Sequence, residues 1–330
     1  MAKATKTEQS GNQDKYLDAV KKLEAKYGAG TIIVGNTVNQ ELEVVPSGSL
    51  NLDVATGIKG LPVGKLIEIF GPESSGKSTI TLHIEANFQK LPGRCILIDF
   101  EHSFDKKYAT TLGVDVSKLT IIQPDCMEDG YNIALELIKT GEVRLIVIDS
   151  HTAAIPKVVV EGNVGDATIG MQARINSVAL GKIKPLLTPN RCTMIGVSQL
   201  RTKIGDYGDP EKPTGGNAWK FYSDIRLKVS KVLDKVNNLN KTAVEVIKNK
   251  CAPPFGKAEF CINWGTGIDR LKEIIDQACV FGYIQAGGAG WFTIGETKLQ
   301  GADKVKAFLL DNPEYLEQLE KDIMEKMKGA

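Results

Sequence analysis

The stretch LIEIFGPESSGKS, residues 66–78, decides the fold of this chain. Its first five residues form an apolar run that predicts a buried strand, and residues 79–88 predict a helix. Between them, residues 71–78 match the phosphate-binding pattern G-x-x-x-x-G-K-[ST] in full. Strand, glycine loop and helix are the parts of a nucleoside triphosphate site, so the sequence predicts one here.

Each residue type in this loop has a chemical reason to be there. The two glycines let the backbone curl so that successive N–H groups point into one concavity. The following helix start adds unpaired N–H donors that favour an anion. We expect Lys77 to reach the terminal phosphates and the Ser78 hydroxyl to bind Mg²⁺, roles that a plain helix-capping turn would not require. The predicted nucleotide ligands of the loop are Gly71, Pro72, Glu73, Ser74, Ser75, Gly76, Lys77 and Ser78.

The bulk composition is that of an ordinary globular protein. A length of 330 residues indicates about two domains. The net charge of +1 means that any nucleic-acid site is a local patch and not a global field. Six cysteines without a C-x-x-C pair read as reduced thiols, and no signal peptide or membrane span is visible. We therefore expect a cytoplasmic protein with no membrane partner.

The pattern along the chain predicts four segments. Residues 1–13 are polar and read as a disordered tail. Residues 14–39 hold an amphipathic helix, from Asp14 to about Tyr27, that must pack on its own core or on a neighbouring subunit. Residues 40–268 alternate apolar strands with helices, and residues 269–330 read as a small C-terminal domain of helices around a hairpin at 287–298.

The predicted fold class is α/β, with a central and mostly parallel sheet. Strands are expected at residues 66–70, 95–99, 119–123, 145–149 and 193–198. Several are apolar without alternation, as in parallel strands that are buried on both faces. After Lys220, residues 223–232, 242–249 and 257–263 alternate more, and we expect them to extend the sheet as antiparallel strands.

Two carboxylates follow predicted strands. Asp149 ends the strand at 145–149, where a carboxylate beside the glycine loop can hold Mg²⁺; the alternative is an Asp that caps the next turn. Glu101 follows the strand that ends at Asp99 and is placed to polarise an attacking water, although an acid after a strand is often simply solvated. His102, beside it, reads as a scaffold residue.

Gln199 follows the strand at 193–198 and is a candidate reporter of the γ-phosphate. The segment after it, residues 200–217, is rich in glycine and predicts a long irregular loop. Arg201, Lys203 and Tyr207 give this loop cations and an aromatic ring, a mix that suits a single-stranded nucleic acid. The alternative is a solvated loop without a ligand.

Taken together, these motifs resemble the bacterial RecA recombinase family. The resemblance covers about residue 14 nearly to the C-terminus. It is carried by the glycine loop and by motifs in the same order: DFEH at 99–102, LGVD at 112–115, QPD at 123–125, VIDS at 147–150, GGN at 215–217, KFY at 220–222, KNK at 248–250 and PF at 254–255.

The resemblance implies roles for matching positions. Glu101 would activate water, Lys77 would contact the phosphates, and Gln199 would couple the γ-phosphate to the DNA-binding loop after it. Further nucleotide contacts would come from Asp105, Tyr108, Asp149, Lys248 and Lys250, the last two reaching the neighbouring subunit's nucleotide. The implied DNA-binding residues are Ile169, Gly170, Met171, Arg174, Arg201, Lys203, Tyr207, Gly215 and Gly216. Lys220, Phe221 and Arg226, with the N-terminal helix and a strand near 31–34, would join subunits into an open helical filament.

The implied activity is that of an ATP- and Mg²⁺-dependent recombinase. It would form filaments on single-stranded DNA, pair them with homologous double-stranded DNA and exchange strands in recombination and repair. The resemblance also implies activation of SOS repressor self-cleavage and contact with single-strand-binding protein. Two other readings share parts of this evidence: a ring-forming DNA motor, and a filament scaffold that binds DNA without hydrolysis.

Several positions depart from the family pattern. Ser198 stands where the family usually has Asn before the Gln, and Ile169 replaces Met in the first loop. His151 and Phe100 are unusual beside the active-site strands, and the second loop is one residue shorter and carries Asp206 and Asp209. The long acidic tail of many members is missing, so less restrained access of DNA is expected. These departures indicate a divergent member of the family.

Overall fold

The structure is a computed structural model that describes residues 6–28, 32, 42–163, 170–202, 211–213, 215–234 and 239–328. The chain forms two compact units, Met1–Leu42 and Glu43–Ala330. In the first unit, helix α1 spans Lys6–Tyr27. It begins before the predicted start at Asp14, so the prediction of a disordered tail is wrong for residues 6–13. This stretch has no proline to stop a helix. The predicted strand near 31–34 lies outside the described residues except for Ile32.

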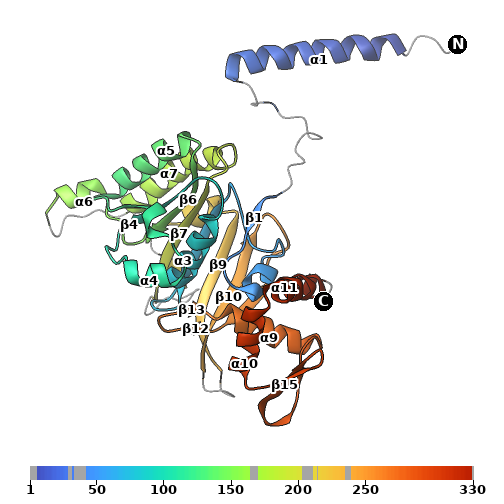
Figure 1. Cartoon of the computed structure of the whole chain (residues 1–330). Coiled ribbons are helices and arrows are strands. Elements are labelled where there is room, and N and C mark those ends of the chain that lie inside the picture. The colour runs from blue at the N-terminus through green and yellow to red at the C-terminus, as the bar shows by residue number, and fades with distance from the viewer. Residues whose placement is uncertain are drawn as a thin grey trace. The chain divides into compact units, whose positions relative to one another are not determined.

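The second unit is built around one large sheet (Figure 1). Its strands lie in the order β11-β10-β9-β3-β7-β6-β4-β5, with β8 paired to β7. Their bounds are β3 Leu66–Gly71, β4 Arg94–Asp99, β5 Leu119–Ile122, β6 Val143–Asp149, β7 Thr193–Thr202, β8 Glu211–Pro213, β9 Ile225–Asp234, β10 Leu239–Asn249 and β11 Lys257–Phe260. All five strands predicted for the first part of the core are confirmed, which establishes the α/β class.

Strand directions follow the predicted scheme in part. β3, β4, β5, β6 and β7 form parallel pairs, whereas β9, β10 and β11 pair antiparallel with one another. The predicted antiparallel extension of the sheet is confirmed for β9, β10 and β11, but it joins the rest of the sheet through a parallel pair of β9 with β3, in which Glu68 lies opposite Arg226. The strand predicted at 257–263 is split, because β12 (Ile262–Asn263) leaves the sheet and pairs with β13 (Gly267–Ile268).

Helices cover both faces of this sheet (Figure 1). On one face, α3 (Lys77–Phe88) buries Ile80, Ile84 and Phe88 against the strands. On the other face lie α5 (Met127–Lys139) and α7 (Met171–Leu187), which pack with Trp219 of α8 (Ala218–Tyr222). Because the parallel strands are apolar on both sides, two separate cores form above and below one sheet.

The C-terminal segment has a third core of its own. Its elements are α9 Arg270–Val280, β14 Gln285–Ala286, β15 Trp291–Ile294, β16 Thr297–Gln300, α10 Ala302–Asp311 and α11 Pro313–Lys328. Leu50 of α2 (Leu50–Ala55) belongs to the same core, and Glu273 accepts hydrogen bonds from Ser49 Oγ (2.8 Å) and Leu50 N (2.6 Å). The boundary predicted at 268/269 stays a prediction, since these contacts cross it. Among the described helices, none has the length and apolar character that crossing a membrane requires.

Candidate nucleotide and DNA site

The glycine loop connects β3 to α3 as the motif predicts, with the helix starting at Lys77 and not at Thr79. Gly76 caps this helix with φ +99°, a conformation that favours glycine. A Cβ there would lie 2.5 Å from Ile262 Cδ1. A Cβ at Gly71 would lie 2.1 Å from the Val229 carbonyl oxygen. Gly71 is therefore needed for the close approach to the Val229 backbone, and Gly76 is needed for its positive φ.

The lysine of the loop is buried. Lys77 Nζ donates to the carbonyl oxygens of Gly71 (3.0 Å) and Pro72 (2.6 Å). Burial lowers the pKa of Lys77, while the nearby carboxylates of Asp149, Glu101 and Glu73 oppose that shift. Ser75 Oγ is buried with no hydrogen-bond partner among the described residues. An unpaired hydroxyl and a cation in one loop fit a bound phosphate.

The predicted magnesium ligands lie side by side. Ser78 Oγ, in the first turn of α3, donates to Asp149 Oδ2, at the end of β6, at 2.9 Å. Burial raises the pKa of Asp149 to about 6; the hydrogen bond from Ser78 opposes this shift, and the charges of Glu101 and Asp99 add to it. No cluster of three His, Cys, Asp or Glu side chains occurs in the described part of the chain. Mg²⁺ does not need one, because it binds through one or two protein oxygens plus phosphates and waters.

Glu101 is held by a turn that Asp99 organises. The buried Asp99 carboxylate accepts from the backbone N–H groups of Glu101 (3.1 Å), Ser103 (3.4 Å) and Phe104 (3.3 Å). It also accepts from Gln123 Nε2 at 3.1 Å. Asp99 was expected only as the last residue of a strand, and the structure makes it the residue that positions Glu101.

Three residues predicted for the site, Glu101, Asp149 and Gln199, lie together at the carboxyl edge of the sheet. Glu101 Oε1 accepts from Ser150 Oγ (2.5 Å) and from Gln199 Nε2 (2.8 Å). Thr152 Oγ1 accepts from the Gln199 backbone N–H at 3.2 Å. Since β3, β7, β6 and β4 are consecutive in the sheet, their carboxyl ends bring the loop, Gln199, Asp149 and Glu101 together.

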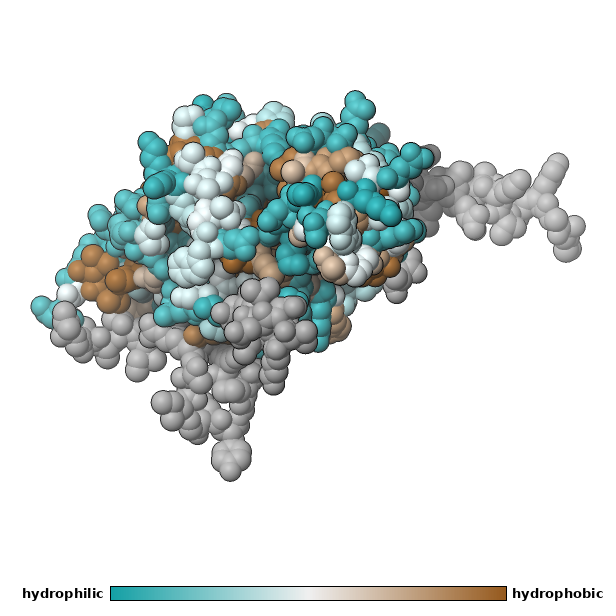
Figure 2. Space-filling model, turned by 60° about the horizontal axis from the view of Figure 1, so that its bottom comes forward, coloured by the Kyte–Doolittle hydropathy of each residue, from teal (hydrophilic) through white to brown (hydrophobic). Residues whose placement is uncertain are grey.

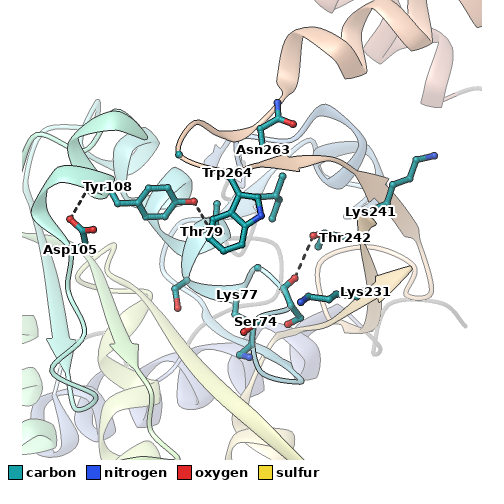
Figure 3. Close-up of a pocket in the computed structure, with 15 residues that line it drawn as sticks. Ser74, Lys77, Thr79, Asp105, Tyr108, Lys231, Lys241, Thr242, Asn263 and Trp264 are labelled. Atoms are coloured by element: carbon teal, nitrogen blue, oxygen red, sulfur yellow. Dashed lines mark hydrogen bonds between the residues drawn. The ribbon is translucent and has the colours of Figure 1, made fainter. Parts of the chain in front are cut away.

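A pocket of about 810 Å³ opens beside the loop. Asp105 caps α4 (Lys106–Thr111) and accepts from the backbone N–H groups of Lys107 and Tyr108, which holds the backbone that carries the Tyr108 ring. Tyr108 Oη lies 2.9 Å from Thr79 Oγ1. Figure 3 shows the rings of Tyr108 and Trp264 on one side of the pocket and Ser74 and Lys77 on the other. The pocket thus offers aromatic surfaces at one end and a phosphate loop at the other.

Sequence reasoning missed Trp264. It lies in the turn between β12 and β13, lines the pocket and is fully exposed. Lys231 and Lys241 of β9 and β10 line the same pocket and were also not predicted. The sequence does place Trp264 between Asn263 and Gly265, which are typical turn residues. A large aromatic residue in a turn is rarely needed for packing, so this tryptophan could have been recognised as a candidate ligand contact.

The residues predicted to reach a neighbouring nucleotide do not line the pocket of their own chain. Lys248 Nζ donates to the last carbonyl oxygens of α8, at Lys220 (2.8 Å) and Phe221 (2.9 Å). Lys250 Nζ lies 3.8 Å from Asp224 Oδ1. Burial lowers the pKa of Lys248, and the charge of Lys250 adds to that shift.

The predicted subunit contacts differ in exposure. Lys220 is exposed, and Phe221 is 69% exposed, unusual for a phenylalanine. Arg226, in contrast, is buried: its Nε donates to Glu68 Oε2 at 2.5 Å and its guanidinium lies over the Phe70 ring. Its side chain is therefore used within the chain, and its role between subunits stays a prediction.

The two predicted DNA segments, residues 161–171 and residues 200–217, both end at helix α7. Gly170 caps α7 with φ +79°, so Met171 begins the helix, and Arg174 in its first turn is exposed. Asn176 Nδ2 of the same helix donates to the Gly215 carbonyl at 2.9 Å. A Cβ at Gly216 would lie 2.5 Å from Ala173 Cβ. The first segment therefore ends, and the second closes, against the same helix.

The second segment is more regular than expected at its ends. Leu200–Thr202 of β7 pair antiparallel with β8, with Arg201 opposite Lys212. Ile169, Lys203 and Tyr207, like Asp206 and Asp209, lie outside the described residues. What the structure adds is that part of the predicted irregular loop forms a short two-stranded ribbon.

An exposed apolar row precedes the first segment. Ile155, and Val158 and Val160 of α6 (Lys157–Glu161), are each close to half exposed. Figure 2 shows a mostly hydrophilic face with a hydrophobic patch at its left edge, the side on which α6 lies in Figure 1. Apolar side chains therefore lie in the open immediately before the first predicted DNA segment.

The fold and the edge geometry define a P-loop nucleotide-binding protein with a RecA-like core. The family model for the RecA N-terminal domain matches residues 15–269, and the model for the RecA C-terminal domain matches residues 272–328. The chain is 44% identical over 338 residues to the protein RecA of Cytophaga hutchinsonii, covering 99% of this chain and 95% of that one. It is 45% identical over 327 residues to the protein RecA of a Nocardioides species, covering 96% and 93%. The chain belongs to the RecA family.

Proposed function

We propose that the chain is an ATP-dependent DNA recombinase that forms helical filaments on single-stranded DNA and exchanges strands with a homologous duplex. The observation that carries the proposal is the bond between Gln199 and Glu101. It links the predicted water-activating carboxylate directly to the strand that continues into the second DNA segment. A ligand that moves one of these groups therefore acts on the other.

The hydrolytic step would use residues of the glycine loop and of the carboxyl edge of the sheet. Lys77 would leave the loop carbonyls and face the terminal phosphates, with the buried Ser75 hydroxyl as a further donor. Ser78 and Asp149 would hold Mg²⁺, which neutralises charge on the β- and γ-phosphates. Glu101 would orient water and accept its proton, help worth about 10²–10⁴ in rate. The adenine base of ATP would stack between the rings of Tyr108 and Trp264.

Polymerisation would complete the site. Lys248 and Lys250 would contact the nucleotide of the adjoining subunit, with Lys248 exchanging its bonds to the α8 carbonyls. Phe221 and the apolar face of α1, where Leu17 and Leu23 are exposed, suit contacts between subunits. A head-to-tail contact of this kind builds an open filament.

The proposed partners are single-stranded DNA, double-stranded DNA and further copies of the chain. Arg174 and the ends of the two predicted DNA segments at α7 would lie nearest to the DNA. The SOS repressor and single-strand-binding protein are partners proposed from family membership. The cytoplasm, where chromosomal DNA and ATP occur together, is the proposed compartment.

The test is ATP hydrolysis with and without single-stranded DNA at low and moderate salt. We expect strong stimulation that weakens as salt rises, because phosphate contacts release counterions. The Lys77→Ala variant should lose hydrolysis and ATP-stabilised filaments in electron micrographs. Hydrolysis that ignores DNA, or strand exchange by Lys77→Ala at the parent rate, would contradict the proposal.

A further inference from the structure

A cluster of polar side chains lies in the interior, next to the carboxyl edge of the sheet where Glu101 lies. Ser198 precedes Gln199 on β7, and His151 follows Ser150 after β6. Ser198, His151 and Glu68 are all at most 2% exposed. Residues adjacent to the proposed catalytic groups thus meet in the interior, where a polar group without a partner is costly.

The hydrogen bonds of this cluster have a fixed direction. Arg226 Nε donates to Glu68 Oε2, and Ser198 Oγ donates to Glu68 Oε1 at 3.0 Å. A hydroxyl has one hydrogen, so at the 2.5 Å contact His151 Nε2 must be the donor and Ser198 Oγ the acceptor. His151 Nδ1 is then the unprotonated nitrogen, and it has no partner among the described residues. The imidazole is therefore held by one hydrogen bond, to Ser198.

The face of the same ring makes the next contact. His151 stacks on Trp219 with ring centroids 4.6 Å apart and 11° between planes. Trp219 Nε1 donates to Tyr131 Oη at 3.3 Å, and Tyr131 Oη donates to Asn176 Oδ1 at 2.6 Å. Asn176 Nδ2 then donates to the carbonyl oxygen of Gly215. An unbroken buried chain of contacts connects β7 with the closing end of the second DNA segment.

A second set of contacts connects the start of α7, where the first predicted DNA segment ends, to the turn that carries His151. Gln172, the second residue of α7, points its amide nitrogen at three carbonyl oxygens at 3.0–3.2 Å, those of His151, Thr152 and Ala154. The turn that carries His151 is thus bound to the helix on which both segments converge. A contiguous network of packed and hydrogen-bonded side chains of this type can carry energetic coupling between the elements that it joins.

We propose that His151, held by Ser198 and stacked on Trp219, is a positioning residue that couples Gln199 to the Gly215 end of the second DNA segment. It sets how strongly bound DNA stimulates hydrolysis. The proposal rests on the proposed function, since it presupposes hydrolysis that DNA stimulates. It requires no contact between His151 and either nucleotide or DNA.

The decisive variant is His151→Phe, which keeps an aromatic ring on Trp219 but cannot donate to Ser198. Turnover is measured at saturating ATP, with and without a saturating oligo(dT) strand, after a thermal melt has confirmed folding. We expect DNA-free turnover within about twofold of the parent and a stimulation factor lowered about fivefold, within the range that coupling residues produce. The KM for ATP should stay near the parent value.

Two further variants separate coupling from stability. Tyr131→Phe removes only the hydroxyl between Trp219 and Asn176 and should lower the stimulation factor by about twofold. Ile138→Ala, in the same core but outside the chain of contacts, should lower the melting temperature and leave the stimulation factor unchanged. If His151→Phe does not fold, Tyr131→Phe decides the proposal alone.

The outcomes distinguish the two levels of the argument. A parent protein whose hydrolysis ignores DNA overturns the proposed function, and the coupling role with it. A stimulated parent with equally stimulated His151→Phe and Tyr131→Phe overturns only the coupling role. Equal losses with and without DNA would mean general damage and would also overturn it.

Discussion

Two glutamates, Glu68 on β3 and Glu101 in the turn after β4, have similar partners and opposite surroundings. Glu101 bonds with Ser150 and Gln199 at the exposed edge, whereas Glu68 bonds with Ser198 and, through it, His151 inside the sheet face. The partners are consecutive in sequence, 150 beside 151 and 198 beside 199. One short step along the chain therefore separates a group at the exposed edge from a group enclosed in the core.

The comparison shows that consecutive residues of one strand have different surroundings and different roles. Side chains alternate between environments along a strand, so neighbouring residues of β7 serve an open edge and a closed core. The exposed contacts are free to rearrange around a substrate. The buried contacts are fixed, because separating them would leave polar atoms unpaired away from water. Substitutions at Glu101 and at the Glu68–Arg226 pair should therefore fail in different assays.

The largest effect is expected on the exposed side. Glu101→Gln keeps the size of the side chain but removes the proton acceptor, so ATP turnover should fall by about 10²–10⁴ while ATP still binds. Filaments should become long-lived, and the free energy of unfolding should change by less than about 0.5 kcal/mol. Steady-state hydrolysis, nucleotide titration and urea unfolding measure the three.

The matched control is Glu136→Gln, an exposed glutamate of α5 that pairs with Lys139. It should leave hydrolysis at the parent rate. Hydrolysis by Glu101→Gln at that same rate would show that another group activates water.

On the buried side the first loss should be stability. Arg226→Met leaves the Glu68 carboxylate without its cation in the interior, which should lower the free energy of unfolding by about 3–5 kcal/mol. The double variant Glu68→Leu with Arg226→Met should recover most of this loss, since apolar replacement of a buried ion pair is often neutral. Urea unfolding measures both variants. A single variant as stable as the parent would mean that the pair is not needed for the fold.

A third glutamate sharpens the contrast, with an effect of about 1.4 kcal/mol for each pH unit. Glu85 of α3 is as buried as Glu68, but its Oε2 has no hydrogen-bond partner among the described residues. Burial raises the pKa of Glu85 from 4.5 to about 8. Between these values the folded chain holds a proton that the unfolded chain has lost, so stability falls as pH rises through this window and levels off above it.

Glu85→Gln should remove this slope, about 1.4 kcal/mol for each pH unit in the middle of the window. Urea unfolding of parent and variant at pH 5.5, 6.5 and 7.5 measures it. Parallel curves for the two proteins would show that Glu85 is ionised in the folded state.

The sequence predicted the parts of the site that local patterns determine. The loop, the strand ends and the carboxylates at 101 and 149 follow from residue type and spacing along the chain. The parallel pairing of β9 with β3 did not, because it is a contact between distant segments. The start of α1 was missed because polar residues carry little periodic signal.

The buried cluster was beyond sequence reasoning for a different reason. Ser198 and His151 stood out as departures, but nothing in the sequence places them in contact with each other and with Trp219. Asp99 and Trp264 were missed because their roles depend on which turns fold back on them. Through-space neighbours, not residue types, define these functions.

The Trp219 ring that stacks on His151 also packs against a glycine of β7. A Cβ at position 196 would lie 2.3 Å from the indole ring, so the ring occupies this position only because Gly196 has no side chain. Any substitution that adds a side chain at position 196 would therefore force the indole, and with it the stacking contact to His151, to move.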